Sequence, residues 1–321
     1  MTQLGQYPAP AHVIAHLSDT HFLGGGRPLH GAVDVESNLA RALAQLEASG
    51  VRPEALVFTG DLADLAEPDA YARLRALVEP AAERLAAQVI WVMGNHDERA
   101  AFASLLHGED ETDAPQDRVH WLGGLRVISF DTTVPGYHHG EITDGQLEWL
   151  AAELATAAPE GTLLAVHHPP IPVTVDIMAT LELERQDRLA AVLAGTDVRG
   201  ILGGHLHYAT HSLFAGIPVS VAAATCYTLD PLAAADKLLS GVDGGQSINL
   251  VHVFADRVVH SIVPVTETRE VSSWPASARA RVDALTPEQR REVLSSKSST
   301  FTMADAATSE PSAPVPDERA R

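Results

Sequence analysis

Aspartate, asparagine and histidine gather in five short stretches of this chain, each following an apolar run. The stretches are SDTH, TGDLAD, GNHDE, HH and GGHLH. Their donor groups are carboxylate oxygens, an amide oxygen and imidazole nitrogens, a mixture typical of catalytic sites for Mn, Fe, Co or Zn rather than of Cys-type structural zinc sites. The candidate metal ligands in these stretches are Asp19, His21, Asp61, Asn95, His167, His205 and His207.

The number of candidates bears on how many ions the site would hold. A catalytic ion with an open coordination position needs about three protein ligands. Seven candidates therefore fit two ions that share one bridging carboxylate. Asp19 and His21 are two residues apart, as are His205 and His207. Alternate residues point to the same side of an extended backbone, so each pair can reach one metal cluster.

Each stretch taken alone also has an ordinary structural explanation. Gly94-Asn95 is typical of a turn, and Asp19 could cap a helix or form a turn. A lone Gly-Asp pair after a strand usually forms a turn, and a lone His-x-His pair is more often a surface feature than a metal site. Five such stretches, all at the ends of predicted strands, favour the catalytic interpretation.

Alternating strands and helices must position these residues. Strands are predicted to begin at His12, Ala55, Gln88, Leu125, Thr162 and Gly200. Helices are predicted to begin at Val35, at Pro68 and at Thr143, which has capping-box spacing to Gln146. The carboxyl ends of strands line the ligand crevice of an open α/β sheet, and the five stretches lie at such ends. The short alternating strands of residues 211–265 predict a second, partly antiparallel sheet.

Composition limits the classes of partner and location. The chain has 321 residues, with 42 Asp and Glu against 22 Lys and Arg. An acidic surface repels polyanions and argues against bulk nucleic acid as a partner, whereas a bound metal can still attract a small anionic substrate. Cys226 is the single cysteine and is predicted to be a buried, inert thiol in a reducing compartment. We find no signal peptide and no apolar stretch that would cross a bilayer, so we expect a cytoplasmic protein.

The end of the chain differs in composition from the rest. From residue 276 onward, seven basic residues balance seven acidic ones, so the excess charge of −20 lies in the first 275 residues. A short helix is predicted to start at Thr286-Pro287. The Ser-, Ala- and Pro-rich segment after it is predicted to be disordered.

The motifs D-x-H, G-D-x-x-D, G-N-H-D, H and G-H-x-H, in this order, resemble those of the calcineurin-like metallophosphoesterases. Longer strings such as LSDTHFLGGGRPLHGAVD, WVMGNHDERA and GIPVSVAAATCYT are similar to class III cyclic nucleotide phosphodiesterases of the mycobacterial cAMP type. The resemblance covers residues 13–265. It implies an α/β fold, a four-layer αββα sandwich with two mixed sheets. We expect a catalytic domain over residues 1–268 and a C-terminal extension over residues 269–321.

The resemblance also implies roles for the candidate residues. One ion would be held by Asp19, His21, Asp61 and His207, and the other by Asp61, Asn95, His167 and His205. His96 and Asp64 would be the catalytic pair, with Asp97 as an alternative partner for His96. The substrate would contact Asn95, His96, His138 and His207, with His139 as the alternative to His138 on a phosphate oxygen. The metals implied are Mn and/or Fe, with Zn or Co as alternatives.

The implied reaction is hydrolysis of 3′,5′-cyclic nucleotides, cAMP first, to 5′-nucleotides. Two adjacent cations lower the pKa of a bridging water, and the resulting hydroxide would attack phosphorus in line. His96 would give a proton to the leaving alkoxide, with Asp64 holding its tautomer. A homodimer is implied by the same resemblance.

Other functions of the same site stay open. It could act on 2′,3′-cyclic nucleotides or glycerophosphodiesters. A phosphoprotein phosphatase is disfavoured by the acidic surface, and a nuclease by the missing basic track. A non-catalytic metal-binding scaffold would have no need of His96 or of a complete ligand set.

Overall fold

The computed structural model describes residues 3–265 and 269–300. The chain divides into two compact units, one of Pro10–Thr266 and one of Met1–Ala9 with Glu267–Arg321. No helix among the described residues is long and apolar enough to cross a membrane.

Two mixed sheets form the centre of the larger unit. The first has the order β13-β12-β1-β2-β3, in which β1, β2 and β3 are parallel and β12 and β13 are antiparallel additions. Its strands are β1 (His12–Leu17), β2 (Ala55–Thr59), β3 (Gln88–Val92), β12 (Ser247–Val253) and β13 (Val258–Pro264).

The second sheet has the order β4-β5-β6-β7-β9-β8, with β5, β6, β7 and β9 parallel. Its strands are β4 (Arg118–Leu122), β5 (Leu125–Phe130), β6 (Thr162–Val166), β7 (Val198–Gly203), β8 (Thr210–Phe214) and β9 (Ile217–Val221). A small hairpin of β10 (Thr228–Leu229) and β11 (Gly241–Val242) completes the unit.

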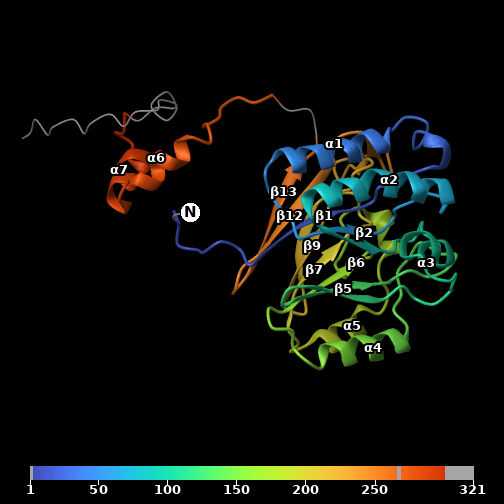
Figure 1. Ribbon diagram of the computed structural model, residues 1–321. Coiled ribbons are helices and arrows are strands. Elements are labelled where there is room, and N and C mark those ends of the chain that lie inside the picture. The colour runs from blue at the N-terminus through green and yellow to red at the C-terminus, as the bar shows by residue number, and fades with distance from the viewer. Residues whose placement is uncertain (1–2, 266–268, 301–321) are drawn as a thin grey trace, which may run out of the picture. The chain divides into compact units, whose positions relative to one another are not determined.

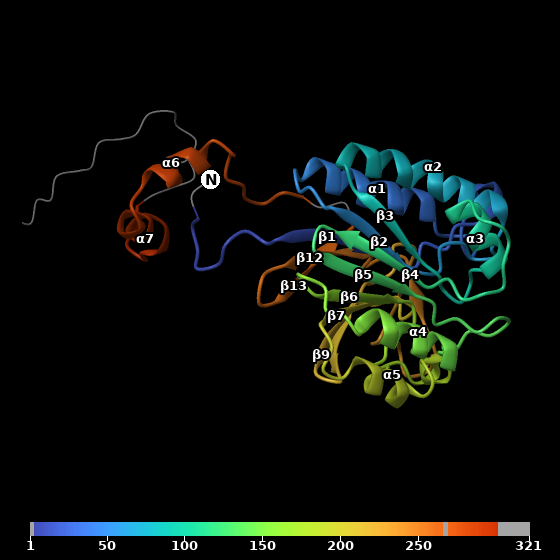
Figure 2. The ribbon, with the colours of Figure 1, turned by 60° about the horizontal axis from the view of Figure 1, so that its bottom comes forward.

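Helices cover the outer face of each sheet, which gives the four layers expected of the αββα sandwich (Figure 1 and Figure 2). The first sheet carries α1 (Val35–Ala48), α2 (Pro68–Leu85) and α3 (Arg99–His107). The second carries α4 (Asp144–Leu154) and α5 (Gln186–Leu193). Two 3-10 turns, η1 (Gly24–Gly26) and η2 (Asp176–Leu181), lie in the connections.

Three apolar cores hold these layers together. Between the sheets, residues such as Ile14, Val57, Ile90, Val127 and Leu163 are fully buried against one another. One further core lies between the first sheet and its helices, and another between the second sheet and its helices. Because each sheet is buried on both faces, its central strands are continuous apolar runs rather than alternating ones.

The predicted helix starts are confirmed by their caps. At α4 the Thr143 side chain accepts from the Gln146 backbone N–H while the Gln146 side chain accepts from the Thr143 N–H, so the capping box is complete. Pro68 opens α2, where its missing N–H costs nothing. At α1 the Asp34 side chain caps the helix by accepting from the Ser37 N–H.

Some elements differ from the sequence expectations. Most strands of residues 211–265 do not build a separate sheet: β8 and β9 extend the second sheet and β12 and β13 extend the first, whereas β10 and β11 form a two-stranded sheet of their own. Periodicity cannot show which sheet an edge strand joins, because that depends on contacts far apart in the chain. The helices α3 and α5 and the strand β4 were not anticipated either; the two helices are short, and β4 lies at a sheet edge.

A buried histidine links the two sheets at the ends opposite the five motif stretches. His12 at the start of β1 places its Nδ1 atom 3.0 Å from a Glu54 carboxylate oxygen and its Nε2 atom 2.9 Å from one of Glu160. Glu54 precedes β2 in one sheet, and Glu160 precedes β6 in the other. Burial disfavours a charged His12 ring, but the two carboxylates outweigh burial and raise its pKa above the ordinary 6.5.

The smaller unit contains two short helices, α6 (Ala278–Ala284) and α7 (Pro287–Ser295). The helix predicted at Thr286-Pro287 is α7, with a complete capping box between Thr286 and Gln289. The α6 helix was not anticipated. Most of the segment predicted to be disordered, residues 301–321, lies outside the described residues. The division into a catalytic domain of residues 1–268 and an extension of residues 269–321 stays a prediction.

Candidate metal centre

Five parallel strands deliver the motif residues to one place. Their last residues are Leu17, Thr59, Val92, Val166 and Gly203. The side chains that follow them are Asp19 and His21 after β1, Asp61 and Asp64 after β2, Asn95 and His96 after β3, His167 after β6, and His205 and His207 after β7. Both sheets therefore contribute to the centre, which lies at the carboxyl ends of their strands.

Four of the candidate ligands form one tight group. Asp19, His21, Asp61 and His207 each offer a ligand atom, and these atoms all lie within 4.8 Å of one another. The His21 and His207 Nε2 atoms are 3.1 Å apart, and the His21 Nε2 atom is 3.4 Å from Asp61 Oδ2. All four side chains are buried. This group coincides with the first of the two ligand sets expected from the sequence.

The remaining ligands lie on the other side of Asp61. The His167 Nε2 atom is 3.4 Å from Asp61 Oδ2 and 3.0 Å from Asn95 Oδ1. His205 and His167 also have ligand atoms within 4.8 Å of each other, in a group that includes His168. The Asp61 carboxylate thus touches both sets, as a bridging ligand must.

Backbone carbonyls fix the ring orientation of three ligand histidines. The Nδ1 atom of His167 lies 2.7 Å from the Thr59 carbonyl oxygen, and the Nδ1 atom of His207 lies 3.0 Å from that of Tyr227. The Nε2 atom of His205 lies 3.0 Å from the Leu181 carbonyl oxygen. A carbonyl only accepts, so each of these nitrogens donates and the other ring nitrogen keeps its lone pair for a metal ion.

The backbone is strained at the ligand positions. Ten non-glycine residues among those described have positive φ, and five of these are candidate ligands. They are Asp19 (52°), His21 (46°), Asp61 (50°), His205 (69°) and His207 (57°). Non-glycine residues persist in this conformation only where surrounding contacts impose it, and such residues cluster at functional sites.

Two glycines allow the motif loops to approach one another closely. A Cβ atom on Gly94 would overlap the backbone nitrogen and Oδ1 of Asp61. A Cβ atom on Gly204 would overlap the Ser18 hydroxyl and crowd Asp19. The Gly before Asn95 is therefore required for packing against Asp61, which the turn interpretation of Gly94-Asn95 did not include.

The charges of the centre call for cations. Burial raises the pKa of Asp19 to about 6, although neighbouring histidines oppose the rise. Burial also disfavours a charged His167, yet Asp61 outweighs it and the pKa of His167 rises to about 9. Among residues 3–265 and 269–300, no Lys or Arg pairs with Asp19 or Asp61. Buried carboxylates beside imidazoles, with no fixed Lys or Arg partner, match the donor set of a divalent metal site, in which the cation would take the place of the histidine protons.

Comparison with known proteins agrees with this geometry. Residues 12–209 match the family described as calcineurin-like phosphoesterase. This chain belongs to that family. Its fold also matches a dimetal phosphatase from Danio rerio, with a TM-score of 0.58, 16% identity and coverage of 80% of this chain and 98% of the other.

Two curated relatives of the phosphoesterase are more similar in sequence. A cAMP/cGMP dual specificity phosphodiesterase of Mycobacterium tuberculosis is 55% identical over 276 residues, which are 86% of each chain. A probable cyclic nucleotide phosphodiesterase of Rhodococcus erythropolis is 56% identical over 260 residues, 81% of this chain and 86% of the relative.

His96 and Asp64 lie at the edge of the phosphoesterase centre. The His96 Nδ1 atom is 2.9 Å from the backbone carbonyl oxygen of Asp64 and 3.4 Å from its carboxylate. The Asp64 carboxylate is closer to His21, at 3.0 Å from Nδ1. The His96 backbone N–H donates to Asp61. The Asp64 carbonyl, rather than its carboxylate, is thus the nearer group that orients the His96 ring.

Asp97, the alternative partner for His96, is committed elsewhere. Its carboxylate accepts hydrogen bonds from the backbone N–H groups of Leu62, Ala63 and Gly94, and from the Tyr71 hydroxyl. It therefore fastens the loops after β2 and β3 to each other. Sequence spacing alone cannot show whether an aspartate in this position holds two loops together or hydrogen-bonds the adjacent histidine.

Of the two histidines in GYHHGE, only His138 meets the centre. Its Nδ1 atom is 2.8 Å from Asn95 Nδ2, and its ring centroid is 5.0 Å from that of His96. His139 instead groups with Glu141 and Glu184. The structure thus favours His138 over His139 for contact with substrate.

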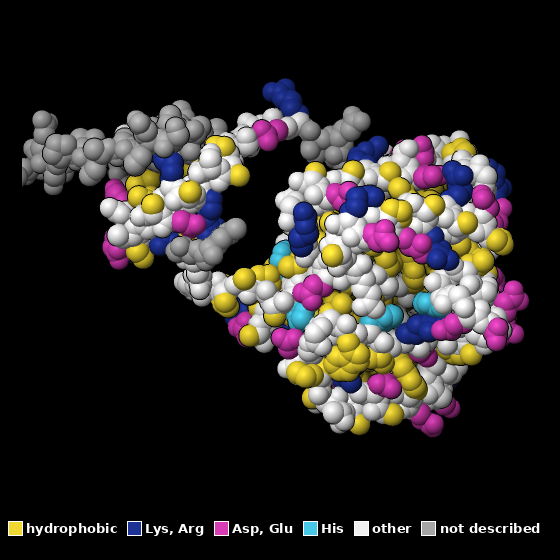
Figure 3. All heavy atoms as spheres, viewed as in Figure 1, with side chains coloured by type: hydrophobic (Ala, Val, Ile, Leu, Met, Phe, Trp, Pro, Cys, Tyr) yellow, Lys and Arg dark blue, Asp and Glu magenta, His cyan; other side chains and the backbone are white. Residues whose placement is uncertain are grey.

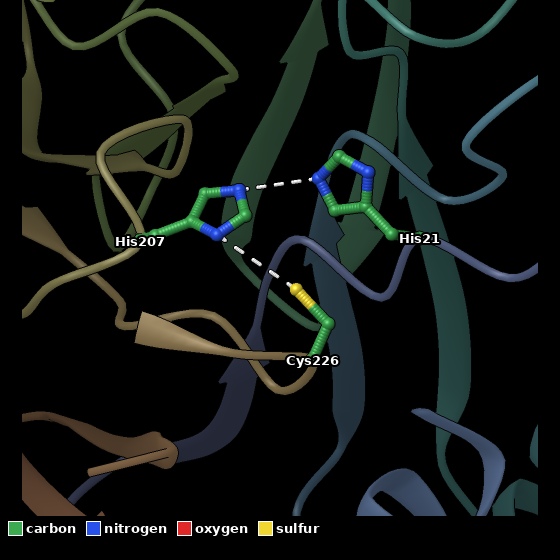
Figure 4. Close-up of side chains that lie close together, drawn as sticks. All are labelled: His21, His207 and Cys226. Atoms are coloured by element: carbon green, nitrogen blue, oxygen red, sulfur yellow. Dashed lines mark hydrogen bonds between the residues drawn. The ribbon is translucent and has the colours of Figure 1, made fainter. Parts of the chain in front are cut away.

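Two close neighbours of the ligands were not among the predicted site residues. Cys226 is buried, as predicted, but its Sγ atom lies 3.8 Å from His207 Nδ1, and it groups with His21 and His207 (Figure 4). His168 packs against His205 with ring centroids 4.5 Å apart. The HH pair signalled His168, whereas nothing in the string VAAATCYT pointed to the centre.

Proposed function

We propose that this phosphoesterase hydrolyses 3′,5′-cyclic nucleotides, cAMP first, to 5′-nucleotides. The observation that carries the reaction type is the pair of ligand sets that meet at Asp61, with His96 directly beside them. The substrate assignment is supported by the two relatives above, which are named cyclic nucleotide phosphodiesterases and match most of the chain.

The proposed centre holds two metal ions, Mn²⁺ and/or Fe, with Zn²⁺ or Co²⁺ as alternatives. One ion is assigned to Asp19, His21, Asp61 and His207, and the other to Asp61, Asn95, His167 and His205. When bound, two such ions lower the pKa of a water and neutralise the phosphoryl oxygens. Both sets consist of oxygen and imidazole donors, which these metals accept as ligands.

The chain's own residues account for orientation and proton transfer. Asn95 and His138 face each other and would contact the phosphate together with His207 and His96. In its doubly protonated form, His96 can give its Nε2 proton to the leaving ribose oxygen while its Nδ1–H stays hydrogen-bonded to the Asp64 carbonyl oxygen. Asp64 therefore acts as a positioning residue for His96 and, through its carboxylate, for His21.

Turnover by the purified, Mn²⁺-loaded protein tests this function. The substrates would be cAMP, cGMP, 2′,3′-cAMP, glycerophosphoethanolamine, bis-p-nitrophenyl phosphate and p-nitrophenyl phosphate, with Asn95→Ala as the site variant. We expect diester hydrolysis that includes cAMP and is lost in the variant. Hydrolysis of the model diester without cAMP would reject the cyclic nucleotide assignment. An inactive protein with two ions bound would favour the scaffold alternative.

The homodimer implied by the resemblance and the cytoplasmic location expected from the sequence stay predictions.

A further inference from the structure

A cavity of about 390 Å³ lies beside the metal centre. It is formed by the end of β3, the loop that follows it, the first turn of α3, the connection between α3 and β4, and the segment after β5. Its lining residues include Met93, Asn95, Glu98, Arg99 and Thr133. Its volume is within the range of small-molecule sites.

Asn95 connects this cavity to the centre. Asn95 lines the cavity, and its side chain contacts the ligand His167 and the candidate substrate residue His138. A group attached to a phosphate held at Asn95 can therefore extend into the cavity. None of the other candidate ligands lines it.

The cavity carries an arginine that is already fully engaged. The Arg99 Nε atom donates to Asp131 at 2.9 Å, and its two terminal nitrogens donate to the carbonyl oxygens of Asp113 and Thr133. The guanidinium therefore shapes the wall and is not free to bind a second phosphate. Apolar surface from Met93 and Val134 completes a lining suited to a flat ring.

The uncommitted polar groups of the cavity are mainly acceptors. The carboxylates of Glu98 and Asp113 are exposed, and neither has a side-chain partner among the described residues. Beside them, the first turn of α3 offers the backbone N–H groups of Arg99 and Ala100, which have no intrahelical acceptor. The cavity thus presents strong acceptors next to backbone donors.

We propose that this cavity holds the nucleobase of the cyclic nucleotide and that the Glu98 carboxylate selects an amine-bearing purine. The inference rests on the proposed function and adds its specificity determinant. An exocyclic amine donates, and the adjacent ring nitrogen or carbonyl of a purine accepts, which is the complement of a carboxylate beside free N–H groups. Asp113 accepts a second hydrogen bond or raises the local negative potential.

The same polar groups disfavour other substituents of the phosphodiester in this cavity. An anionic group is repelled by two carboxylates and gains nothing from Arg99, which is neutralised by Asp131. A hypoxanthine ring places a carbonyl oxygen where adenine has its amine, so it would face the Glu98 carboxylate with an acceptor. The Glu98 carboxylate would therefore favour adenine over hypoxanthine.

The test compares kcat/KM for cAMP and 3′,5′-cyclic IMP in the Mn²⁺-loaded wild-type protein and in Glu98→Gln and Asp113→Asn. A glutamine can donate or accept, so we expect Glu98→Gln to reduce the preference for cAMP about tenfold. The matched control is Glu111→Gln, which changes an exposed glutamate outside the cavity lining and should leave the preference unchanged. Turnover of bis-p-nitrophenyl phosphate by the control Glu111→Gln should equal that of the wild type.

The outcomes separate this inference from the proposed function. If cAMP is hydrolysed and the preference is identical in wild type and Glu98→Gln, the nucleobase does not contact Glu98 and the inference is overturned. If Glu98→Gln instead impairs only glycerophosphoethanolamine, the carboxylate recognises a cationic alcohol and the inference is also wrong. If no cyclic nucleotide is hydrolysed while the model diester is, the proposed function itself fails.

Discussion

His96 differs from the ligand histidines in how its ring is held. Its Nδ1 atom is engaged by Asp64, and its side chain is partly exposed, whereas the rings of His167 and His207 are buried. A ring oriented through one nitrogen and open to solvent at the other is suited to proton donation. If His96 is the proton donor, its loss should matter most for a leaving group that needs a proton. Loss of a metal ligand would impair all substrates.

We expect His96→Ala to reduce cAMP turnover by about 10²- to 10⁴-fold, the range typical of a general acid. Bis-p-nitrophenyl phosphate should lose less than about tenfold, since p-nitrophenolate leaves without a proton. Steady-state kinetics on both substrates, with metal content measured in parallel, would check this. His139→Ala is the control, because His139 groups with Glu141 and Glu184 rather than with His96. Equal losses on both substrates would assign His96 to binding instead.

The loops after β2 and β3 pack closely against each other at Gly94 and Asp61. We expect Gly94→Ala to displace Asp61, because the new methyl group would overlap that residue's backbone and carboxylate. The variant should bind fewer metal ions per chain and lose about 1–3 kcal/mol of stability. Metal analysis and thermal unfolding would measure both effects.

Gly145→Ala supplies the matched control for this experiment. Gly145 lies in α4, and a Cβ atom there would have no neighbour within 4 Å. Alanine favours a helix by up to about 1 kcal/mol over glycine. Metal content should be unchanged and the Tm unchanged or slightly higher. A normal metal content in Gly94→Ala would contradict the packing argument.

The link between the sheets through His12 predicts a pH-dependent stability. The folded-state pKa of His12 lies above 6.5, so its contribution is fully present below pH 6.5 and is lost as pH rises through the folded pKa. His12→Gln should therefore cost on the order of 1 kcal/mol at pH 6, a modest figure because both glutamates are partly exposed. The difference from wild type should shrink by pH 9. Urea unfolding at both pH values would measure it, and a constant difference would rule out the charged interaction.

The sequence predicted those elements whose determinants are local. The capping boxes at Thr143 and Thr286 and the proline at Pro68 each lie within one helical turn, and all three helix starts are confirmed. The grouping of Asp19, His21, Asp61 and His207 followed from motif order and family resemblance. By contrast, the placement of β9 beside β7, the hydrogen bonds of Asp97 and the approach of Cys226 to His207 depend on contacts between distant segments. The spacing of residues along a single sequence does not reveal such long-range contacts.

The whole molecule carries an electrostatic constraint on its substrates. Its net charge is −20, and Asp and Glu side chains are spread over the face shown in Figure 3. The field of such a surface extends over about a Debye length, roughly 10 Å at 0.1 M salt. A small monoanion approaching a metal-filled centre experiences little of it, whereas a polyanion that must lie along the surface experiences much more.

We therefore expect different salt responses from two substrates. The kcat/KM for an oligothymidylate of ten nucleotides should be far below that for cAMP and should rise between 20 and 200 mM NaCl, because added salt screens repulsion. The value for cAMP should change little. A value for the oligonucleotide that falls with salt would indicate a basic track and a nuclease function.

Five positions of the centre are occupied by residues poorly suited to their own backbone conformation. Glycine would adopt a positive φ without strain, yet glycine has no donor atom to offer a metal. Stability of the fold would favour glycine at these five positions, whereas catalysis requires a residue with a donor atom. A lineage released from the need for turnover would be free to relax these positions first, and their retention in a descendant would be a sign that catalysis is still under selection.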